Sequence, residues 1–190
     1  MSTLHASTLA LIGTTAFALG ACTDSAPLDP QAELTAQTEL AAHMGQPSPS
    51  AQTNRALAEL RRATARYHDV DAALEDGFIP VGECEAHEGE SPGGIPYANL
   101  DHLVDGSIDP ARPDALLYEP DGKGGVTLVG VELAMPYVLW SAAEPPEFLG
   151  EQFRREDETG VFGLHIWVWR NNPDGMFAWG NPRVSCGDEA

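Results

Sequence analysis

Residues 115–135 read ALLYEPDGKGGVTLVGVELAM, and this stretch decides the fold. Apolar runs at 115–119 and 126–135 flank the segment 120–125, whose Pro, Asp and Gly residues favour a turn. Two strands joined by so short a turn pair as an antiparallel hairpin. The stretch therefore predicts an antiparallel sheet at the centre of the protein.

Segments on both sides of this hairpin add to the predicted sheet. Residues 161–170 are rich in β-branched and aromatic side chains and predict a strand that is apolar on both faces, and residues 78–81 predict a shorter one. The segments 82–113 and 141–158 contain Gly, Pro and polar residues with little periodicity. We expect them to form long irregular loops, which often carry function.

Residues 54–76 show the clearest helical pattern, with apolar side chains close to one face. Asn54 or Thr53 can cap the start, and Gly77 is placed to end the helix in a left-handed turn. The apolar positions are Leu57, Leu60, Tyr67, Val70 and Leu74. We therefore expect an α+β fold, in which one amphipathic helix packs on an antiparallel β-sheet with long irregular loops.

The N-terminus predicts export. Residues 1–21 contain no Asp, Glu, Lys or Arg, and an apolar core at 9–19 is too short to span a bilayer, so they are expected to be a signal peptide. The residues LGAC at 19–22 look like a bacterial lipobox, which predicts lipidation of Cys22, although the usual basic residues near Met1 are missing. Ordinary cleavage and a soluble product are the alternative.

The domain organisation follows from composition. Residues 22–53, with the lipidated Cys22, are rich in Ala, Thr, Gln, Ser and Pro and contain no Lys or Arg, as expected of a flexible acidic tether. Residues 54–190 are expected to form a single globular domain. We expect the protein to be anchored to the membrane through this lipid, in the cell envelope on the periplasmic or extracellular face.

The charge balance excludes some partners. The chain has 29 Asp and Glu against 10 Lys and Arg, a net charge of −19. Nucleic acid is not expected as a partner, because phosphate binding needs clustered cations, and neither is adsorption to anionic lipid headgroups. The acidity fits either solubility or a salty habitat.

Three cysteines remain to be assigned. With Cys22 carrying lipid, Cys84 and Cys186 are left as a pair, and an oxidising compartment favours a disulfide between them. Without a Cys-x-x-Cys motif, a structural role is expected for this disulfide rather than a catalytic one.

One literal motif match fails when it is tested against its mechanism. Residues 89–93, GESPG, match the Gly-x-Ser-x-Gly pattern of a nucleophile elbow. In that motif the residue after the serine donates its backbone N–H to the oxyanion, and Pro92 has no N–H. The sequence therefore does not predict a serine hydrolase here.

The best candidate for chemistry is a histidine beside a carboxylate. Alternation along residues 161–170 puts His165, Trp167 and Trp169 on one face. Alternation along 126–135 puts Glu132 opposite the apolar residues Val129, Val131 and Leu133. If the strands are neighbours, Glu132 meets His165 among indole rings. Such a pair can bind a divalent metal or move a proton, or it can be a hydrogen-bonded pair inside the core.

Two further histidines are weaker metal candidates. His87 lies among carboxylates in residues 83–90, where a loose cation site or a solvated acidic loop is possible. His102 follows Asp101 in the predicted loop.

The segment from 63 to 186 resembles a group of uncharacterised bacterial exported proteins. The resemblance is carried by the motifs ARYHDV (65–70), PDALLYEP (113–120), LVGVE (128–132), LHIWVW (164–169), NPDGMF (172–177) and NPRVSC (181–186). It implies an architecture, candidate positions and the pairing of the two matching cysteines, but no reaction. Members carry a Gly-x-His-Tyr-x-Asn-like segment where this chain has GIPYAN at 94–99, so Pro96 stands in place of a histidine, and Tyr97 and Asn99 join the candidate ligand-binding residues.

Three functions remain open on the sequence. The leading hypothesis is a non-enzymatic envelope lipoprotein that binds a small ligand or metal ion through the face bearing His165, Trp167, Trp169 and Glu132. The second is a hydrolase- or lyase-type enzyme that uses His165 and Glu132 as an acid–base or metal pair. The third is a structural or partner-binding envelope protein in which the same residues are core.

Overall fold

The computed structural model describes residues 50–84 and 90–187, which belong to one compact unit that begins at Ser48. The predicted signal peptide, Cys22, His87 and nearly all of the predicted tether lie outside these residues. Within the described ranges, no helix is long and apolar enough to cross a membrane.

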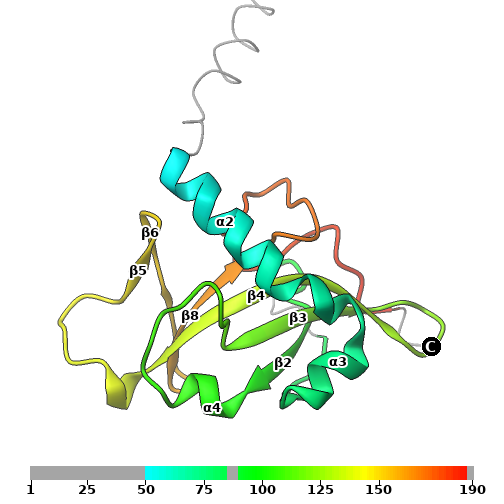
Figure 1. Ribbon diagram of the computed structural model, residues 1–190, viewed down its shortest axis with the longest axis horizontal. Coiled ribbons are helices and arrows are strands. Elements are labelled where there is room, and N and C mark those ends of the chain that lie inside the picture. Colours follow the sequence, from blue (N-terminus) through cyan, green and yellow to red (C-terminus); the bar gives the residue numbers. More distant parts are fainter. Residues whose placement is uncertain (1–49, 85–89, 188–190) are drawn as a thin grey trace, which may run out of the picture. The chain divides into compact units, whose positions relative to one another are not determined.

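A six-stranded antiparallel sheet forms the centre of the fold, in the order β1-β2-β3-β4-β8-β7 (Figure 1). A separate short hairpin pairs β5 with β6. The strands are β1 (Phe78–Pro80), β2 (Ile95–Asn99), β3 (Ala115–Pro120), β4 (Val126–Pro136), β5 (Glu147–Phe148), β6 (Glu151–Gln152), β7 (Arg154–Glu156) and β8 (Val161–Ile166). The predicted α+β class is confirmed.

The predicted hairpin is β3 and β4. Its register shifts between Leu117, opposite Gly130, and Tyr118, opposite Leu128, so Val129 is the extra residue of a β-bulge. The bulge explains why the predicted alternation is wrong for Val129, whose side chain packs with Leu117 rather than with the core residue Val131.

The predicted helix over 54–76 is broken into three pieces, so its continuity was predicted wrongly. They are α2 (Ala51–Thr64), the 3-10 helix η1 (Ala65–His68) and α3 (Val70–Glu75). Asp69 has extended backbone dihedrals, and its side chain accepts a hydrogen bond from Asp71 N at 3.1 Å, which starts a new helix.

The two ends of this helical region differ in how well they were predicted. Ser50, rather than Thr53 or Asn54, caps α2, because its Oγ accepts from Thr53 N at 3.1 Å. Gly77 does end the region in a left-handed conformation, with φ of 91°. Leu74, expected on the buried face, is 46% exposed, since the break rotates α3 relative to the α2 pattern.

Several short elements lie in segments that we expected to be irregular. Strand β2 and α4 (Leu100–Leu103) fall in 82–113, and β5, β6 and β7 fall in 141–158. The strand β2 was missed because Pro96 argues against a paired strand, yet Pro96 lies opposite Leu117 in the sheet. A second 3-10 helix, η2 (Tyr137–Leu139), follows β4.

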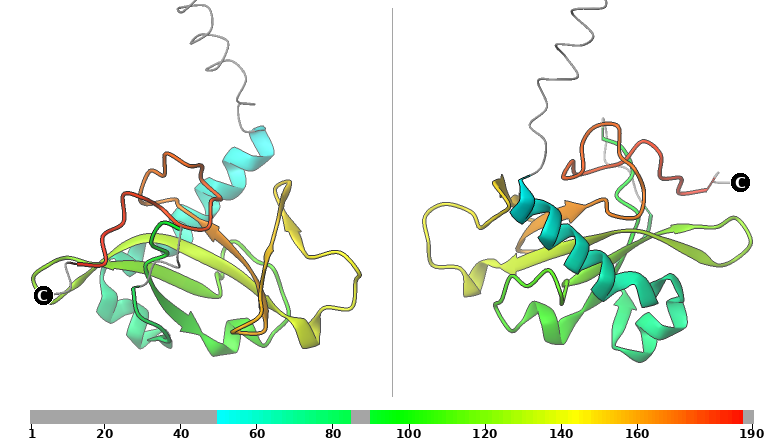
Figure 2. Two further views of the ribbon diagram at one scale, coloured as in Figure 1. Left: turned by 180° about the vertical axis from the view of Figure 1, so that it is seen from behind. Right: turned by 45° about the horizontal axis from the view of Figure 1, so that its top comes forward.

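One face of the sheet forms the main core, and α2 crosses it (Figure 2). Leu57 and Leu60 of α2 are buried against side chains from the central strands. These strand residues are Leu116, Tyr118, Leu128, Val131, Leu133, Met135, Phe162, Leu164 and Ile166.

The opposite face holds a smaller apolar cluster of Leu117, Val129, Trp167 and Val184, with Cys84 packed against it. A disulfide joins Cys84 to Cys186 across 102 residues of sequence, as predicted. The disulfide links the segment after β1 to the C-terminal segment on this face of the sheet.

Candidate functional site

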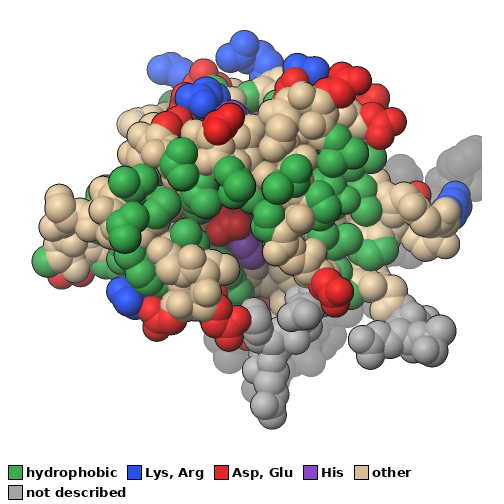
Figure 3. All heavy atoms as spheres, turned by 90° about the horizontal axis from the view of Figure 1, so that it is seen from below, with side chains coloured by type: hydrophobic (Ala, Val, Ile, Leu, Met, Phe, Trp, Pro, Cys, Tyr) green, Lys and Arg blue, Asp and Glu red, His purple; other side chains and the backbone are tan. Residues whose placement is uncertain are grey.

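A pocket of about 470 Å³ opens on the face of the sheet opposite α2. Acidic and histidine side chains lie in a hollow surrounded by hydrophobic ones (Figure 3). The strands contribute Pro96, Ala98, Ala115, Leu117, Glu132, Ala134, Glu156, Val161 and His165. Helix α4 contributes Leu100 and Leu103, and the connecting segments contribute Val81, Ser91, Gly93, Asp114, Glu158, Thr159 and Trp179, among others.

Glu132 and His165 are brought together as the sequence predicted. They are opposite each other in the register of β4 and β8, and Glu132 Oε2 lies 3.9 Å from His165 Nε2. The Glu132 side chain is 14% exposed and that of His165 is 7% exposed. Both residues line the pocket, so the pair is available to a bound molecule.

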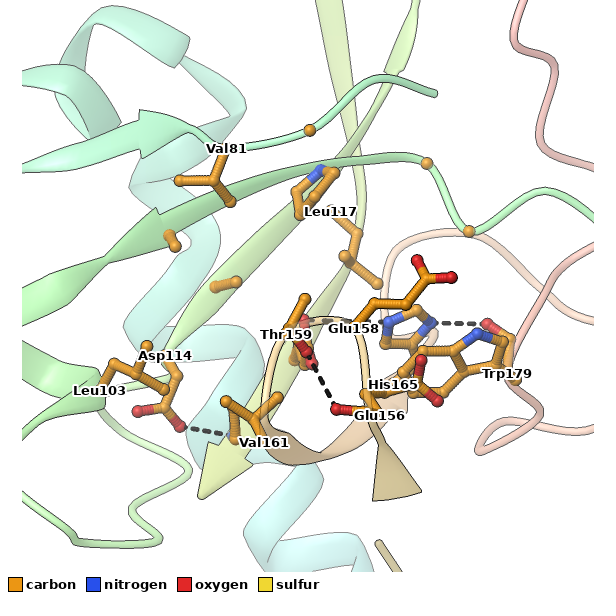
Figure 4. Close-up of a pocket in the computed structure, with 18 of the residues that line it drawn as sticks. Val81, Leu103, Asp114, Leu117, Glu156, Glu158, Thr159, Val161, His165 and Trp179 are labelled. Carbon is orange, nitrogen blue, oxygen red and sulfur yellow. Dashed lines mark hydrogen bonds and ion pairs between the residues drawn. The ribbon is translucent and has the colours of Figure 1, made fainter. Parts of the chain in front are cut away.

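The protonation of His165 follows from its other hydrogen bond. Its Nδ1 lies 2.5 Å from the backbone oxygen of Trp179 (Figure 4). Because a carbonyl oxygen only accepts, Nδ1 carries the proton, and neutral His165 therefore has its lone pair on Nε2, on the side of Glu132. Burial lowers the pKa of His165 to about 4, against the effect of the Trp179 hydrogen bond. The imidazole is thus neutral at neutral pH.

The Glu132 carboxyl is neutral over much of the same range. Burial, together with the smaller effect of the nearby carboxyls of Asp114 and Glu156, raises its pKa to about 8. Among the described residues, the closest basic nitrogen to its oxygens is His165 Nε2, beyond hydrogen-bond distance. At neutral pH, Glu132 can therefore donate a hydrogen bond to a ligand through its O–H or accept one through its carbonyl oxygen.

Asp114 is a second buried carboxyl, just before β3. It is 3% exposed, and its Oδ2 accepts from Ala134 N at 2.8 Å. Burial is the main cause that raises its pKa to about 7. Asp114 lines the pocket together with Glu132, so two buried carboxyl groups lie on this face of the sheet.

The Glu132 side chain lies against Gly163 of the neighbouring strand β8, which has no side chain. A Cβ added to Gly163 would come within about 2.5 Å of Glu132 Oε1 and about 3.1 Å of the Trp179 ring. Glycine inside a strand often marks such a close approach. The Gly163 in the sequence was therefore a usable signal for the site.

Trp179 forms a wall of the site. Its indole stacks on the imidazole of His165, with ring centres 3.9 Å apart and planes 10° apart. The guanidinium of Arg154 lies 4.8 Å from the centre of the Trp179 ring and also pairs with Glu90 and Glu156, at 2.9 and 2.8 Å. Arg154 is thereby held by carboxylates and does not line the pocket.

The two other predicted tryptophans do not line the pocket. Trp167 is buried beside His165 and donates from Nε1 to Ala178 O at 2.6 Å. Trp169 lies on the opposite face, where its Nε1 donates to Thr64 Oγ1 at 3.2 Å. The expectation that Trp169 shares a face with His165 is wrong, because β8 ends at Ile166 and the alternation stops there.

The remaining predicted residues also have other partners. Tyr97 packs on Tyr118 in the main core, with ring centres 4.7 Å apart. Asn99 caps α4 by accepting from Asp101 N and His102 N. His102 Nδ1 lies 2.9 Å from Pro113 O, and its ring packs on Phe78. Of the candidates on the sequence, only Glu132 and His165 line the pocket among the described residues.

Asp114, Glu156 and Trp179 were not singled out on the sequence. Trp179 lies in irregular backbone, so no periodic pattern places it, and Asp114 and Glu156 are two of 29 acidic residues. Pro96 of β2 lines the pocket. Ser91 also lines it, from irregular backbone just before β2.

The described residues hold no group of three or more His, Cys, Asp or Glu side chains arranged for a metal ion. No family model matches the chain, and neither the curated proteins nor the solved structures contain a significant match. The chemistry of the pocket therefore carries the functional argument.

Proposed function

We propose that this protein is an exported envelope lipoprotein that binds a small molecule in the pocket lined by Glu132 and His165. The convergence of these two side chains in an apolar-walled pocket is the observation that supports it. A neutral carboxyl and the free Nε2 of a neutral imidazole offer one donor and two kinds of acceptor. A few convergent polar groups in an apolar pocket are typical of small-molecule sites.

The export part of the proposal has two supports. One is the signal-like sequence of residues 1–21 with the lipobox-like LGAC at 19–22. The other is the disulfide between Cys84 and Cys186, because such bonds persist in oxidising compartments outside the cytoplasm. Mass spectrometry of the membrane fraction tests the lipid on Cys22, and a soluble unmodified product contradicts it.

Ligand binding can be tested with the uncharged dye Nile red, whose emission shifts to the blue in apolar surroundings. We expect saturable binding with one dye per chain. The variant Gly93→Leu should abolish it, because a Cβ on Gly93 would lie 3.5 Å from His165 Cε1 and a longer side chain fills the pocket. Glu59→Leu adds the same side chain at an exposed site on α2 and should leave binding unchanged.

The outcomes separate the proposal from a purely structural role. If Nile red does not bind, or binds equally well to Gly93→Leu protein with an unchanged melting temperature, the pocket is not a ligand site. Ala98→Leu, which narrows the pocket from β2, is a second blocking variant in case Gly93→Leu does not fold.

A second candidate function is acid–base catalysis at the same pair. It is favoured by the fixed tautomer of His165, which turns the basic Nε2 toward the acidic group of Glu132. An enzyme of this kind should lose turnover of its substrate at least about 100-fold in His165→Gln protein, while Nile red binding persists. Equal turnover in the variant would exclude His165 as the acid or base.

A further inference from the structure

The pocket lining has a one-sided charge. Five acidic residues contribute to it, and within the described residues no Lys or Arg does. They are Glu83, Asp114, Glu132, Glu156 and Glu158. Arg154, the nearby cation, lies on Trp179 and is paired with Glu90 and Glu156. A ligand that brings a positive charge would therefore meet no basic side chain of the lining.

The most buried polar side chains of the pocket, Asp114 and His165, offer acceptor atoms to a ligand. Asp114 is 3% exposed, and its Oδ2 accepts a hydrogen bond from Ala134 N. The His165 side chain is 7% exposed, and its Nε2 has no hydrogen bond within the described residues. Both residues line the pocket, as does Glu132 between them in the sheet.

The walls of the pocket are apolar and reach the surface. Leu117, Val161 and Leu103 line it, together with Val81 and Leu100, which are 53% and 51% exposed. Figure 3 shows hydrophobic side chains around the hollow. These walls suit an apolar body, and a bare inorganic ion would leave them uncovered.

We propose that the pocket binds an amphiphilic organic cation, such as a primary amine with a short apolar body, with its ammonium at Glu132 and Asp114. This inference rests on the proposed function and names the chemical class of its ligand. The ammonium donates hydrogen bonds to the two carboxylates, and its third N–H can donate to His165 Nε2. The apolar body lies against Leu117, Val161 and the rim.

Binding then releases a proton. The carboxyl of Glu132, and in part that of Asp114, is protonated when the pocket is empty, and the arriving ammonium favours the ionised form of both, so their O–H bonds break and the protons go to solvent. The titratable groups that face Glu132 are Asp114 before β3, Glu156 on β7 and His165 on β8. Of these, His165 stays neutral near pH 7 and does not take up the proton.

Isothermal titration calorimetry with three molecules of one shape tests the inference. The probes are phenethylamine, 2-phenylethanol and phenylacetate, which present a cation, a neutral hydroxyl and an anion at pH 7. We expect the amine to bind at least about tenfold more tightly than the alcohol, and phenylacetate to be the weakest. Repeating the titration at pH 6.5 in buffers of different ionisation enthalpy should show release of up to about two protons per amine, from Glu132 and Asp114.

Matched variants show whether the pocket causes the preference. Glu132→Gln should reduce the preference for the amine to below about threefold and lower the proton release by about one proton per amine. Glu59→Gln removes the same charge from the exposed surface of α2 and should change neither. Asp114→Asn, whose side-chain oxygen can still accept from Ala134 N, is a second pocket variant if Glu132→Gln does not fold.

The remaining outcomes overturn the inference. Equal affinities for amine and alcohol, tighter binding of phenylacetate, or the same preference in Glu59→Gln and Glu132→Gln proteins would each contradict it. Tight binding of zinc or calcium that phenethylamine does not compete with would identify a metal site instead. If Nile red binds and Gly93→Leu blocks it while the amine shows no preference, this inference fails and the proposed function stands; if neither probe binds, both fail.

Discussion

Thr64 on the α2 side of the sheet and Glu132 on the opposite side are both polar groups in a largely apolar setting. Thr64 is fully buried, donates to Leu60 O and accepts from Trp169 Nε1. Glu132 lies beside two other carboxyls and a histidine nitrogen that is out of hydrogen-bond range. A buried polar group that is partnered stabilises a fold, whereas one that is left open costs free energy unless a ligand completes it.

This difference indicates that the two faces have different tasks. The face under α2 is a dry core whose polar atoms have partners within the protein. The other face keeps acid groups under low solvation and leaves space of about 470 Å³ beside them. Proteins retain such costly arrangements at functional sites, and that supports the pocket as the place where this protein acts.

The largest expected effect concerns the disulfide between Cys84 and Cys186, on the same face of the sheet as the pocket. Replacing Cys84 and Cys186 by serine removes a cross-link over 102 residues and should lower the free energy of unfolding by about 4–5 kcal/mol in the chain-entropy account. Urea denaturation of oxidised protein and variant measures it. Reductant should destabilise the wild-type protein and leave the variant unchanged; equal sensitivity of both would contradict the role of the bond.

On the core face, Leu60→Ala should lower the free energy of unfolding by about 3 kcal/mol, because Leu60 is fully buried under α2 and its truncation leaves a cavity. Leu100→Ala is the matched change at the pocket rim, where the leucine is 51% exposed, and should cost less than about 0.5 kcal/mol. Urea denaturation compares the two. Similar costs would mean that the two faces are not packed differently.

Glu132→Gln should stabilise the protein at high pH. The pKa of Glu132 is about 8 in the folded protein and near 4.5 when unfolded, so the wild type loses stability as the pH rises through this window. Glutamine cannot ionise and avoids the loss. These two pKa values correspond to a gain of about 4–5 kcal/mol at pH 9 and almost none at pH 4.

Thermal melts from pH 4 to pH 9 measure this gain in stability. Glu59→Gln on the exposed surface of α2 is the control, and its melting temperature should follow that of the wild type. A Glu132→Gln protein that is destabilised equally at every pH would show that the carboxylate is satisfied in the fold, and the contrast between the two faces would be lost.

The smallest effect is expected for Thr64→Val, at about 1 kcal/mol of destabilisation that does not vary with pH. The change removes the acceptor of Trp169 Nε1 while it keeps the shape of the side chain. Thr127→Val, at an exposed position of β4, is the control and should be nearly neutral. A stabilising Thr64→Val would mean that the hydrogen bonds on the core face contribute nothing.

The parts of this fold that were predictable depend on neighbours in sequence. The hairpin of β3 and β4 is joined by the five residues 121–125, which are rich in Asp and Gly, and Gly77 ends a helix directly before β1. The pairing of Glu132 with His165 required only that β4 and β8 be adjacent with sides set by alternation. These features follow from local patterns that hold without knowledge of the rest of the chain.

The parts that were missed depend on details that break a pattern. The bulge at Val129 changes the face of one side chain, and the end of β8 at Ile166 moves Trp169 to the other side of the sheet. The cap at Asp69 divides a helix whose apolar spacing looked continuous. Each is a local competition between hydrogen-bonding options that hydrophobic periodicity does not register.

The sequence by itself determined the α+β class, the central hairpin, the Cys84–Cys186 pair and, provided that β4 and β8 are neighbours, the meeting of Glu132 with His165. Only the tertiary structure decided that this pair lines a pocket. Asp114, Glu156 and Trp179 come to it from separate segments, and their approach depends on how loops cross one face of the sheet. The charge state of the site was decided there too, because a pKa depends on the solvation and neighbours that folding creates.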